Sequence, residues 1–235
     1  MEKKRRQDID ILRGLALLMM VFYHLLFDLS FFGNYDIPVL TGFWKFFARS
    51  TAILFITTAG ISLSLAAKEK PFKQILQRIT IILFAALGIS VTTFLFFKEQ
   101  FIFFGILHLI GVSLLITYPF HNKPKLSLLL SFFSLLLGFY LSTTTISSSS
   151  FLWIGLRSEQ FQTLDYFPLF PWISFLFLGI FLGNKIYKKK SFIQKENIIT
   201  KPFSFLGKHT LTIYLIHQPL LILLLSLLGI ISFPF

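Results

Sequence analysis

The chain has 235 residues, of which 55% are hydrophobic, 14% are charged and 32 are Phe. Soluble domains carry about 25% charged residues. This composition, with a mean hydropathy of +0.76, therefore excludes an ordinary soluble enzyme, a disordered tail and a coiled coil. The chain has no Cys, which excludes a disulfide scaffold, a cysteine zinc site, an iron–sulfur cluster and a cysteine nucleophile.

Seven apolar runs are long enough to cross a membrane as helices, because a span needs about 17–25 mostly apolar residues. The sequence therefore predicts an all-α, polytopic membrane helix bundle that forms a single transmembrane domain over residues 1–235. The first run is too long, and too rich in Asp, Arg and His, for a cleaved signal peptide. The predicted spans are residues 9–32, 43–67, 75–97, 101–120, 126–146, 166–187 and 210–231.

The net charge of +12 predicts the orientation of this bundle. Of the 22 Lys and Arg residues, 18 fall on the side of the N-terminus, Lys98 and Arg157 fall on the other side, and Lys45 and Arg49 lie within the second run. Cytoplasmic loops carry the excess of Lys and Arg, so the N-terminus is predicted inside and the C-terminus outside. The basic charge is thus an orientation signal and does not predict nucleic-acid binding. The expected partner is a lipid bilayer, and the expected location is a prokaryotic cell (inner) membrane.

The first run carries four ionisable residues on one face. At 100° per residue, Asp10, Arg13, His24 and Asp28 share an arc of about 60°. Charged groups cost about 2.5–3.5 kcal/mol each at the centre of a span, so they mark functional sites by default. The alternative is that they act as polar contacts between helices. For the four residues together, the shared stripe favours function.

Depth along the helices separates the polar residues into two layers. His24 lies about 16 Å further along its helix than Arg13, at about 1.5 Å per residue. This arrangement suits a reaction whose two substrates arrive from opposite sides of the membrane. The outer layer is predicted to hold His24, Asp28, Arg49, His108 and Asp165, and the inner layer Asp10, Arg13, Asn184, Tyr214, His217 and Gln218.

The outer layer contains the candidate catalytic residues. A His with an Asp one turn away can act as a general base, because the carboxylate stabilises the imidazolium and fixes its tautomer. His24 with Asp28 fits this pattern, and His108 is the rival base at a similar depth. In the inner layer, the guanidinium of Arg13 can bind phosphate through its paired N–H groups. Two histidines without a carboxylate of certain proximity do not predict a metal site, so no metal is expected.

Five motifs in order along the chain resemble a known family. The run from Asp10 to Leu17, with the later Tyr23-His24 and Phe27-Asp28-Leu29, resembles the first helix of the DUF1624 family. Arg13 and His24 also fit the Arg-x10-His pattern of a wider transmembrane acyltransferase group. The DUF1624 family contains prokaryotic relatives of the heparan-alpha-glucosaminide N-acetyltransferase catalytic domain, within that wider group, which includes the acyltransferase-3 proteins. The other matching segments are residues 55–60, 105–111, 165–172 and 206–219.

The resemblance implies an acyltransferase that moves an acyl group, most simply acetyl, from cytoplasmic acyl-CoA to an amine or hydroxyl of an extracytoplasmic sugar or glycan. Acetyl-CoA would be the acyl donor, and relatives of the lysosomal enzyme suggest a homodimer. Residues 29–42 contain no His, whereas lysosomal members use one there, so N- and O-acylation both stay open. The expected acyl-CoA contacts are Asp10, Arg13, Tyr214, His217 and Gln218, and the expected acceptor contacts are Arg49, Asp165 and Trp172. For Tyr214, His217 and Gln218 an alternative stays open, namely that they form hydrogen bonds between helices.

Two other classes of protein stay open from the sequence alone. A proton-coupled transporter of a small polar solute would also carry ionisable residues within its spans, although no internal repeat supports an inverted-repeat transporter. A structural membrane subunit would use the same residues only for assembly. Acyl-CoA binding distinguishes an acyltransferase from both.

Overall fold

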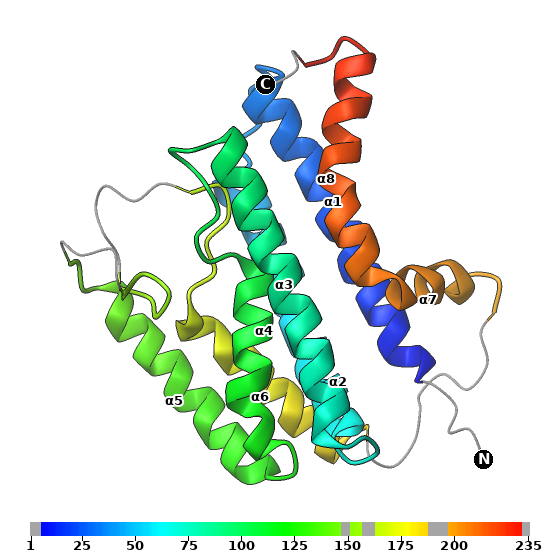
Figure 1. Ribbon diagram of the computed structural model, residues 1–235, viewed down its shortest axis with the longest axis vertical. Helices are drawn as coiled ribbons and strands as arrows, with labels where there is room; N and C mark the ends of the chain where they lie inside the picture. The colour runs from blue at the N-terminus through cyan, green and yellow to red at the C-terminus, as the bar shows by residue number, and fades with distance from the viewer. Residues whose placement is uncertain (1–5, 147–150, 157–162, 188–196, 232–235) are drawn as a thin grey trace. The chain divides into compact units, whose positions relative to one another are not determined.

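The structure of the protein is a computed structural model that describes residues 6–146, 151–156, 163–187 and 197–231. These residues form helices and connections, which confirms the all-α prediction. The helices are α1 (Gln7–Phe32), α2 (Gly42–Ala66), α3 (Phe72–Phe96), α4 (Ile106–Thr117), the 3-10 helix η1 (Tyr118–Phe120), α5 (Pro124–Ser142), α6 (Leu169–Lys185), α7 (Thr200–Lys208) and α8 (Thr210–Leu227). Figure 1 shows their order along the chain.

Five of these helices are long and apolar enough to cross a membrane, namely α1, α2, α3, α5 and α8. The segments Ile106–Phe120 and Leu169–Lys185 are shorter apolar helices. Each of the seven predicted spans therefore contains one apolar helix, but the number of crossings and the sides of the termini stay predictions. Arg157, which was assigned to the outer side, and the last residues of the chain, 232–235, lie outside the described residues.

Two helix starts differ from the predicted ones because the backbone there pairs with another segment. Residues before α4 and α6 lie in connections whose main chains bond to each other, through Leu164 N–H to the Gln100 carbonyl and Phe167 N–H to the Phe104 carbonyl (3.0 and 3.1 Å). Thr163 adds a hydroxyl hydrogen bond to the Phe101 carbonyl at 2.8 Å. The apolar pattern continues through these connections, so it placed both helix starts too early.

Helix α7 was not predicted, because it is amphipathic and too short for a search based on apolar runs. Asn197 marks its beginning: the side-chain Oδ1 accepts hydrogen bonds from the backbone N–H groups of Ile199 and Thr200, at 3.1 and 2.8 Å. Such Asn bonds satisfy amide groups that a helix start leaves unpaired. The buried side of α7 carries Ser204 and Gly207.

The chain divides into two compact units, each described on its own. Unit 1 comprises residues 1–55 and 191–235, and unit 2 comprises residues 56–190. The prediction of one domain over the whole chain stays a prediction.

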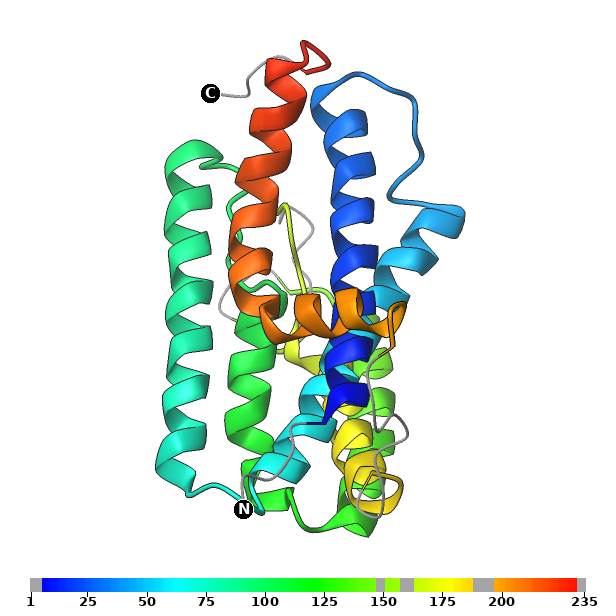
Figure 2. The same ribbon diagram turned by 90° about the vertical axis from the view of Figure 1, so that its right-hand side faces the viewer.

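In unit 1, α1 contacts both α7 and α8. Figure 2 shows α7 crossing the first half of α1, with α8 continuing from the end of α7. The crossing depends on two glycines: a Cβ at Gly14 would meet the Phe203 carbonyl, and a Cβ at Gly207 would meet the Asp10 carbonyl. Near the other end of α1, Leu25 and Leu29 pack against the buried side chains of Ile222 and Leu225. These contacts fix α8 along the polar face of α1.

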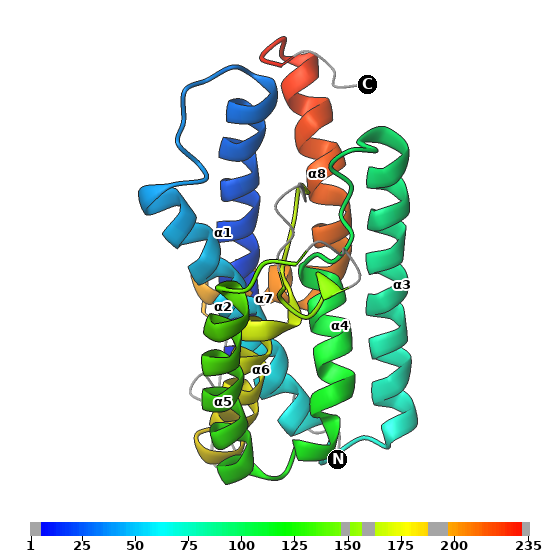
Figure 3. The same cartoon turned by 90° about the vertical axis from the view of Figure 1, so that its left-hand side faces the viewer.

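In unit 2, α5 packs along α6, and α4 contacts both α3 and α6; Figure 3 shows the two helix pairs. The second part of α2 meets α6 at small residues, since a Cβ at Gly60 would meet the Leu176 carbonyl and a Cβ at Gly179 would meet the Thr57 carbonyl. Small residues let helix backbones approach closely in membranes. Asn184 joins the connections at one end, accepting from Lys68 Nζ and donating to the His121 carbonyl.

Candidate active site

Two histidines of unit 1 face each other, His24 from α1 and His217 from α8. Their ring centres are 4.8 Å apart and the ring planes are nearly perpendicular, at 82°. His24 Nδ1 lies 2.9 Å from the Met20 carbonyl oxygen, and His217 Nδ1 lies 2.5 Å from the Tyr214 carbonyl oxygen. A carbonyl can only accept, so each Nδ1 carries the hydrogen, and in the neutral rings each Nε2 keeps a basic lone pair.

A carboxylate lies one turn further along α1. Asp28 is fully buried, and its Oδ1 accepts a hydrogen bond of 2.5 Å from Gln218 Nε2. The tautomer of His24 was predicted to be fixed by Asp28, but in the structure the Met20 carbonyl fixes it. Asp28 instead forms its hydrogen bond with Gln218 of α8. The structure thus brings four predicted site residues into one cluster, which we call the α1–α8 polar cluster: His24, Asp28, His217 and Gln218. The predicted layers are therefore wrong for these residues, since His24 and Asp28 were expected in the outer layer and His217 and Gln218 in the inner one. The ends of an apolar run do not fix the level of one helix against its neighbour.

The α1–α8 polar cluster has more acceptors than donors. Among the described residues, Asp28 Oδ2, His217 Nε2 and Gln218 Oε1 are buried without a hydrogen-bond partner. All three atoms accept hydrogen bonds when the carboxyl is ionised and the ring is neutral. A buried acceptor without a donor costs about 1–3 kcal/mol. The cluster therefore favours a group that brings N–H or O–H donors, or a proton.

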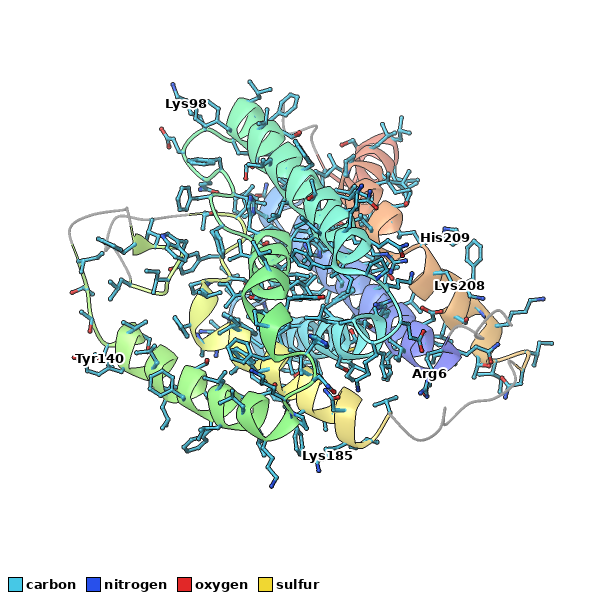
Figure 4. The ribbon with its side chains drawn as sticks, turned by 60° about the horizontal axis from the view of Figure 1, so that its bottom comes forward. Arg6, Lys98, Tyr140, Lys185, Lys208 and His209 are labelled. Carbon is cyan, nitrogen blue, oxygen red and sulfur yellow. The ribbon has the colours of Figure 1, made fainter. Side chains whose placement is uncertain are left out.

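The beginning of α1 carries the predicted phosphate-binding residue. Arg13 Nη1 lies 3.6 Å from Asp10 Oδ1; the Arg13 side chain is 29% exposed and that of Asp10 is 3% exposed. The end of α7 covers this turn through the contact of Gly207 with the Asp10 backbone. Figure 4 shows Arg6 near the start of α1 and Lys208 at the end of α7. The α1–α7 crossing therefore carries cations together with two buried carboxylates at the start of α1, Asp8 and Asp10.

Arg49, predicted to contact the acceptor, lies on the unit 1 part of α2 and is exposed. Tyr214 lies on α8 within the site, with its ring centre 5.5 Å from that of His217. No group of three or more His, Asp or Glu side chains that could hold a metal ion occurs within the described ranges.

His108, the rival base, lies in unit 2 and uses both ring nitrogens within its own unit. The Gly105 backbone N–H donates to its Nδ1 at 3.4 Å, which places the ring hydrogen on Nε2, 3.4 Å from Ser90 Oγ. The Ser90 hydroxyl in turn donates to the Ile102 carbonyl at 2.5 Å. His108 therefore joins α3, α4 and the connection between them, and neither nitrogen is left as a free base.

Asp165 also has a structural partner in unit 2. Its Oδ2 accepts a hydrogen bond of 3.0 Å from the backbone N–H of Ile106, the first residue of α4. A carboxylate at this place satisfies an unpaired amide and interacts favourably with the helix dipole. Loss of hydration raises the pKa of the Asp165 carboxyl to about 6, although the Ile106 hydrogen bond opposes this shift.

Trp172, predicted to contact the acceptor, packs among aromatic rings. Its ring centre lies 4.7 Å from that of Phe167 and 6.0 Å from that of Phe175.

The raised pKa of Asp165 predicts a pH-dependent stability. Its ordinary value is 3.8 and its folded value is about 6, so the folded state binds the proton more tightly. The resulting stabilisation is complete below the lower value and is lost as the pH rises through about 6. We therefore expect the unfolding temperature of the wild type, relative to Asp165→Asn, to rise when the pH is lowered from 7.5 to 4.5.

Thermal unfolding in detergent, followed by Trp fluorescence, measures this difference. Asn keeps an oxygen that can accept from Ile106 N–H but does not titrate, so it separates the proton from the helix cap. Asp165→Ala removes both the titrating group and the helix cap, so it should lower the free energy of unfolding by about 1 kcal/mol at pH 7.5 as well. Parallel pH profiles for wild type and Asp165→Asn would contradict the assignment.

The long-range contacts of the site have no local sequence signal. Asp28 and Gln218 are 190 positions apart, and their spacing along each helix says nothing about the partner helix. Sequence reasoning missed the roles of Met20 and Ser90, since a backbone carbonyl carries no residue signature and a Ser in an apolar run is common.

Comparison with known proteins supplies the family. Searches of curated proteins and of solved structures give no match to this chain. A comparison with family models confirms the resemblance inferred from the motifs in α1, α4 and α8. Because the model of the heparan-alpha-glucosaminide N-acetyltransferase catalytic family matches residues 5–219, the chain belongs to that family.

Proposed function

We propose that this protein is a membrane-embedded acyltransferase that moves an acetyl group from cytoplasmic acyl-CoA to an amine or hydroxyl of an extracytoplasmic sugar. The observation that carries the proposal is the His24–His217 pair on the polar face of α1, in a chain of an acetyltransferase family. The proposed location is a prokaryotic cell membrane, with seven crossings and the N-terminus inside, and the proposed assembly is a homodimer.

In the proposed mechanism, His24 is the general base. Its Nε2 takes the proton of the acceptor as the acceptor nitrogen or oxygen attacks the thioester carbonyl carbon, and the carbon–sulfur bond then breaks. The Met20 carbonyl supports this role in two ways. It holds the hydrogen on Nδ1, which leaves Nε2 basic, and it accepts a hydrogen bond from the imidazolium that forms. A positioned base of this kind typically contributes about 10²–10⁴-fold to the rate.

The contacts of the two candidate bases support His24 over His108. Both ring nitrogens of His108 have partners in its own unit, so proton transfer there would first break a contact that joins α3 to α4. His24 has one nitrogen bound to its own helix, and its ring packs against that of His217. We therefore propose His108 as a positioning residue of unit 2.

The acyl-CoA contacts are proposed at the α1–α7 crossing. Acetyl-CoA carries phosphates, which suit the Arg13 guanidinium and the neighbouring positive charge of Arg6 and Lys208. When bound there, acetyl-CoA supplies the activated acyl group. Arg49, Asp165 and Trp172 stay the proposed acceptor contacts, and the acceptor nucleophile stays an amine or a hydroxyl.

One observation favours a second candidate, a proton-coupled transporter. Asp28 is a fully buried carboxyl group within a membrane helix, and carboxyl and His groups in spans also form proton relays in transporters. Such a protein would move its solute without forming or breaking a covalent bond.

Reconstitution into proteoliposomes of known orientation tests the proposal. With labelled acetyl-CoA on the side of the N-terminus and an amine- or hydroxyl-bearing sugar on the other side, we expect free CoA and acetylated sugar in equal amounts. Sugar flux without acetylation would support the transporter instead. A folded protein that neither binds acyl-CoA nor releases CoA would overturn the proposed function. Transfer that occurs only when both substrates are on the same side of the membrane would show that the proposed topology is wrong.

A further inference from the structure

We propose that His217 is a second proton-transferring residue, which receives the acceptor's proton from His24 and delivers it to the sulfur of the leaving CoA. This inference rests on the proposed function and assigns to His217 a chemical step instead of a contact along the acyl-CoA path.

The two rings are in contact, although no hydrogen bond joins His217 Nε2 to His24 in the structure. Their centres are 4.8 Å apart, and each Nδ1–H is held by a carbonyl of its own helix. Proton exchange is thereby restricted to the Nε2 atom of each ring. His217 Nε2 is buried, and it has no hydrogen-bond partner among the described residues. A buried basic nitrogen beside the proposed base is a site for the proton that the base removes.

The charges around the pair support a single shared proton. Two imidazolium ions at this separation repel each other strongly where water is scarce. The charge of one imidazolium is balanced by the carboxylate of Asp28, which lies one helical turn from His24 and is bonded to Gln218, the neighbour of His217 in the sequence. The α1–α8 polar cluster therefore balances one positive charge, on either ring, against one negative charge.

The reaction releases a proton at the acceptor and needs one at the leaving sulfur. The acceptor X–H loses a proton while the X–C bond forms, and the CoA sulfur gains a proton as the C–S bond breaks. The products are the acylated acceptor and CoA thiol, so no proton is taken from or given to the solvent overall. A thiolate released into apolar surroundings is costly. Transfer from His24 Nε2 to His217 Nε2 and then to the sulfur balances the reaction within one site.

Asparagine variants test the two histidines separately, because the Asn side-chain N–H can replace Nδ1–H while no basic Nε2 remains. His217→Asn is the test variant and His24→Asn the comparison. The matched control is His121→Asn in unit 2. Like His217, His121 bonds through Nδ1 to the backbone carbonyl of a Tyr three positions earlier, here Tyr118 at 2.8 Å. Each purified protein is assayed for acetyl-CoA binding and for transfer from two donors, acetyl-CoA and its selenium analogue, acetyl-seleno-CoA.

A selenolate leaves without needing a proton, so the second donor bypasses the proposed step. We expect His217→Asn to lose about 10²-fold or more in transfer from acetyl-CoA and to work near the wild-type rate with the selenoester. His24→Asn should be slow with both donors, because the acceptor must still lose its proton. His121→Asn should match the wild type with both donors.

Three results would overturn the inference. Equal losses of His217→Asn with both donors would make His217 a structural residue. Loss of acetyl-CoA binding in His217→Asn would make it a contact of the acyl donor. A wild-type rate of His217→Asn with acetyl-CoA would mean that another group protonates the sulfur. If the proposed function itself is wrong, the wild type shows no transfer from either donor, which separates the two failures.

Discussion

Replacing His24 by Asn is expected to lower the rate of acetyl transfer about 10²–10⁴-fold while leaving acetyl-CoA affinity close to the wild-type value. The reason is the position of its two nitrogens. The Asn side chain can still donate to the Met20 carbonyl, as His24 Nδ1 does, so α1 keeps its local structure. What is lost is the basic Nε2 that accepts the proton of the acceptor. The measurement is CoA release with a saturating acceptor, alongside acetyl-CoA binding by the same purified protein.

The comparison variant is His108→Asn, the rival base. Its ring joins α3 to α4 through Ser90 and Gly105, so the variant should unfold at a lower temperature, and the protein that stays folded should retain turnover. Near-normal turnover in His24→Asn together with loss in His108→Asn would contradict the assignment. The general base would then lie on α4, and the His24–His217 contact would only hold α1 and α8 together.

The sequence predicted the helices well where apolar composition alone decides the structure. Runs of Leu, Ile and Phe with few charges are stable as spans only in helical form, because no water is present to bond to an open backbone. The pattern failed where backbone partners decide the ends of helices, as for Gln100 and Phe104 before α4. It also failed at α7, whose start depends on the Asn197 side chain.

The candidate site was predictable as a face but not as a set of contacts. Helical periodicity placed Asp10, Arg13, His24 and Asp28 on one stripe, and Asp10 and Asp28 are indeed buried. Periodicity cannot tell which helix covers the stripe, so the approach of His217 and Gln218 from α8 was not predicted. The same limit explains why His24 and His108 looked equivalent: residue type and depth are similar, whereas the partners of their ring nitrogens differ.

The second large effect is expected at Arg13, where Arg13→Ala should weaken acetyl-CoA binding about 10–100-fold, equivalent to about 1.4–2.8 kcal/mol. Arg13→Lys should restore only part of the affinity, because Lys keeps the charge but loses the planar pair of N–H donors that fits a phosphate. The matched control is Arg78→Ala, since Arg78 is an exposed arginine on the predicted cytoplasmic side, near the start of α3.

Acetyl-pantetheine distinguishes a phosphate contact from a disturbed helix, because it carries the thioester without the nucleotide phosphates. If Arg13 binds phosphate, wild type and Arg13→Ala should bind acetyl-pantetheine equally well, and the difference between them for acetyl-CoA should shrink as salt screens the charges. Equal weakening for both ligands would mean that Arg13 acts through its ion pair with Asp10, at 3.6 Å. Unchanged acetyl-CoA affinity in a correctly folded Arg13→Ala protein would remove Arg13 from the acyl-CoA site and leave the phosphates to other cations at the α1–α7 crossing.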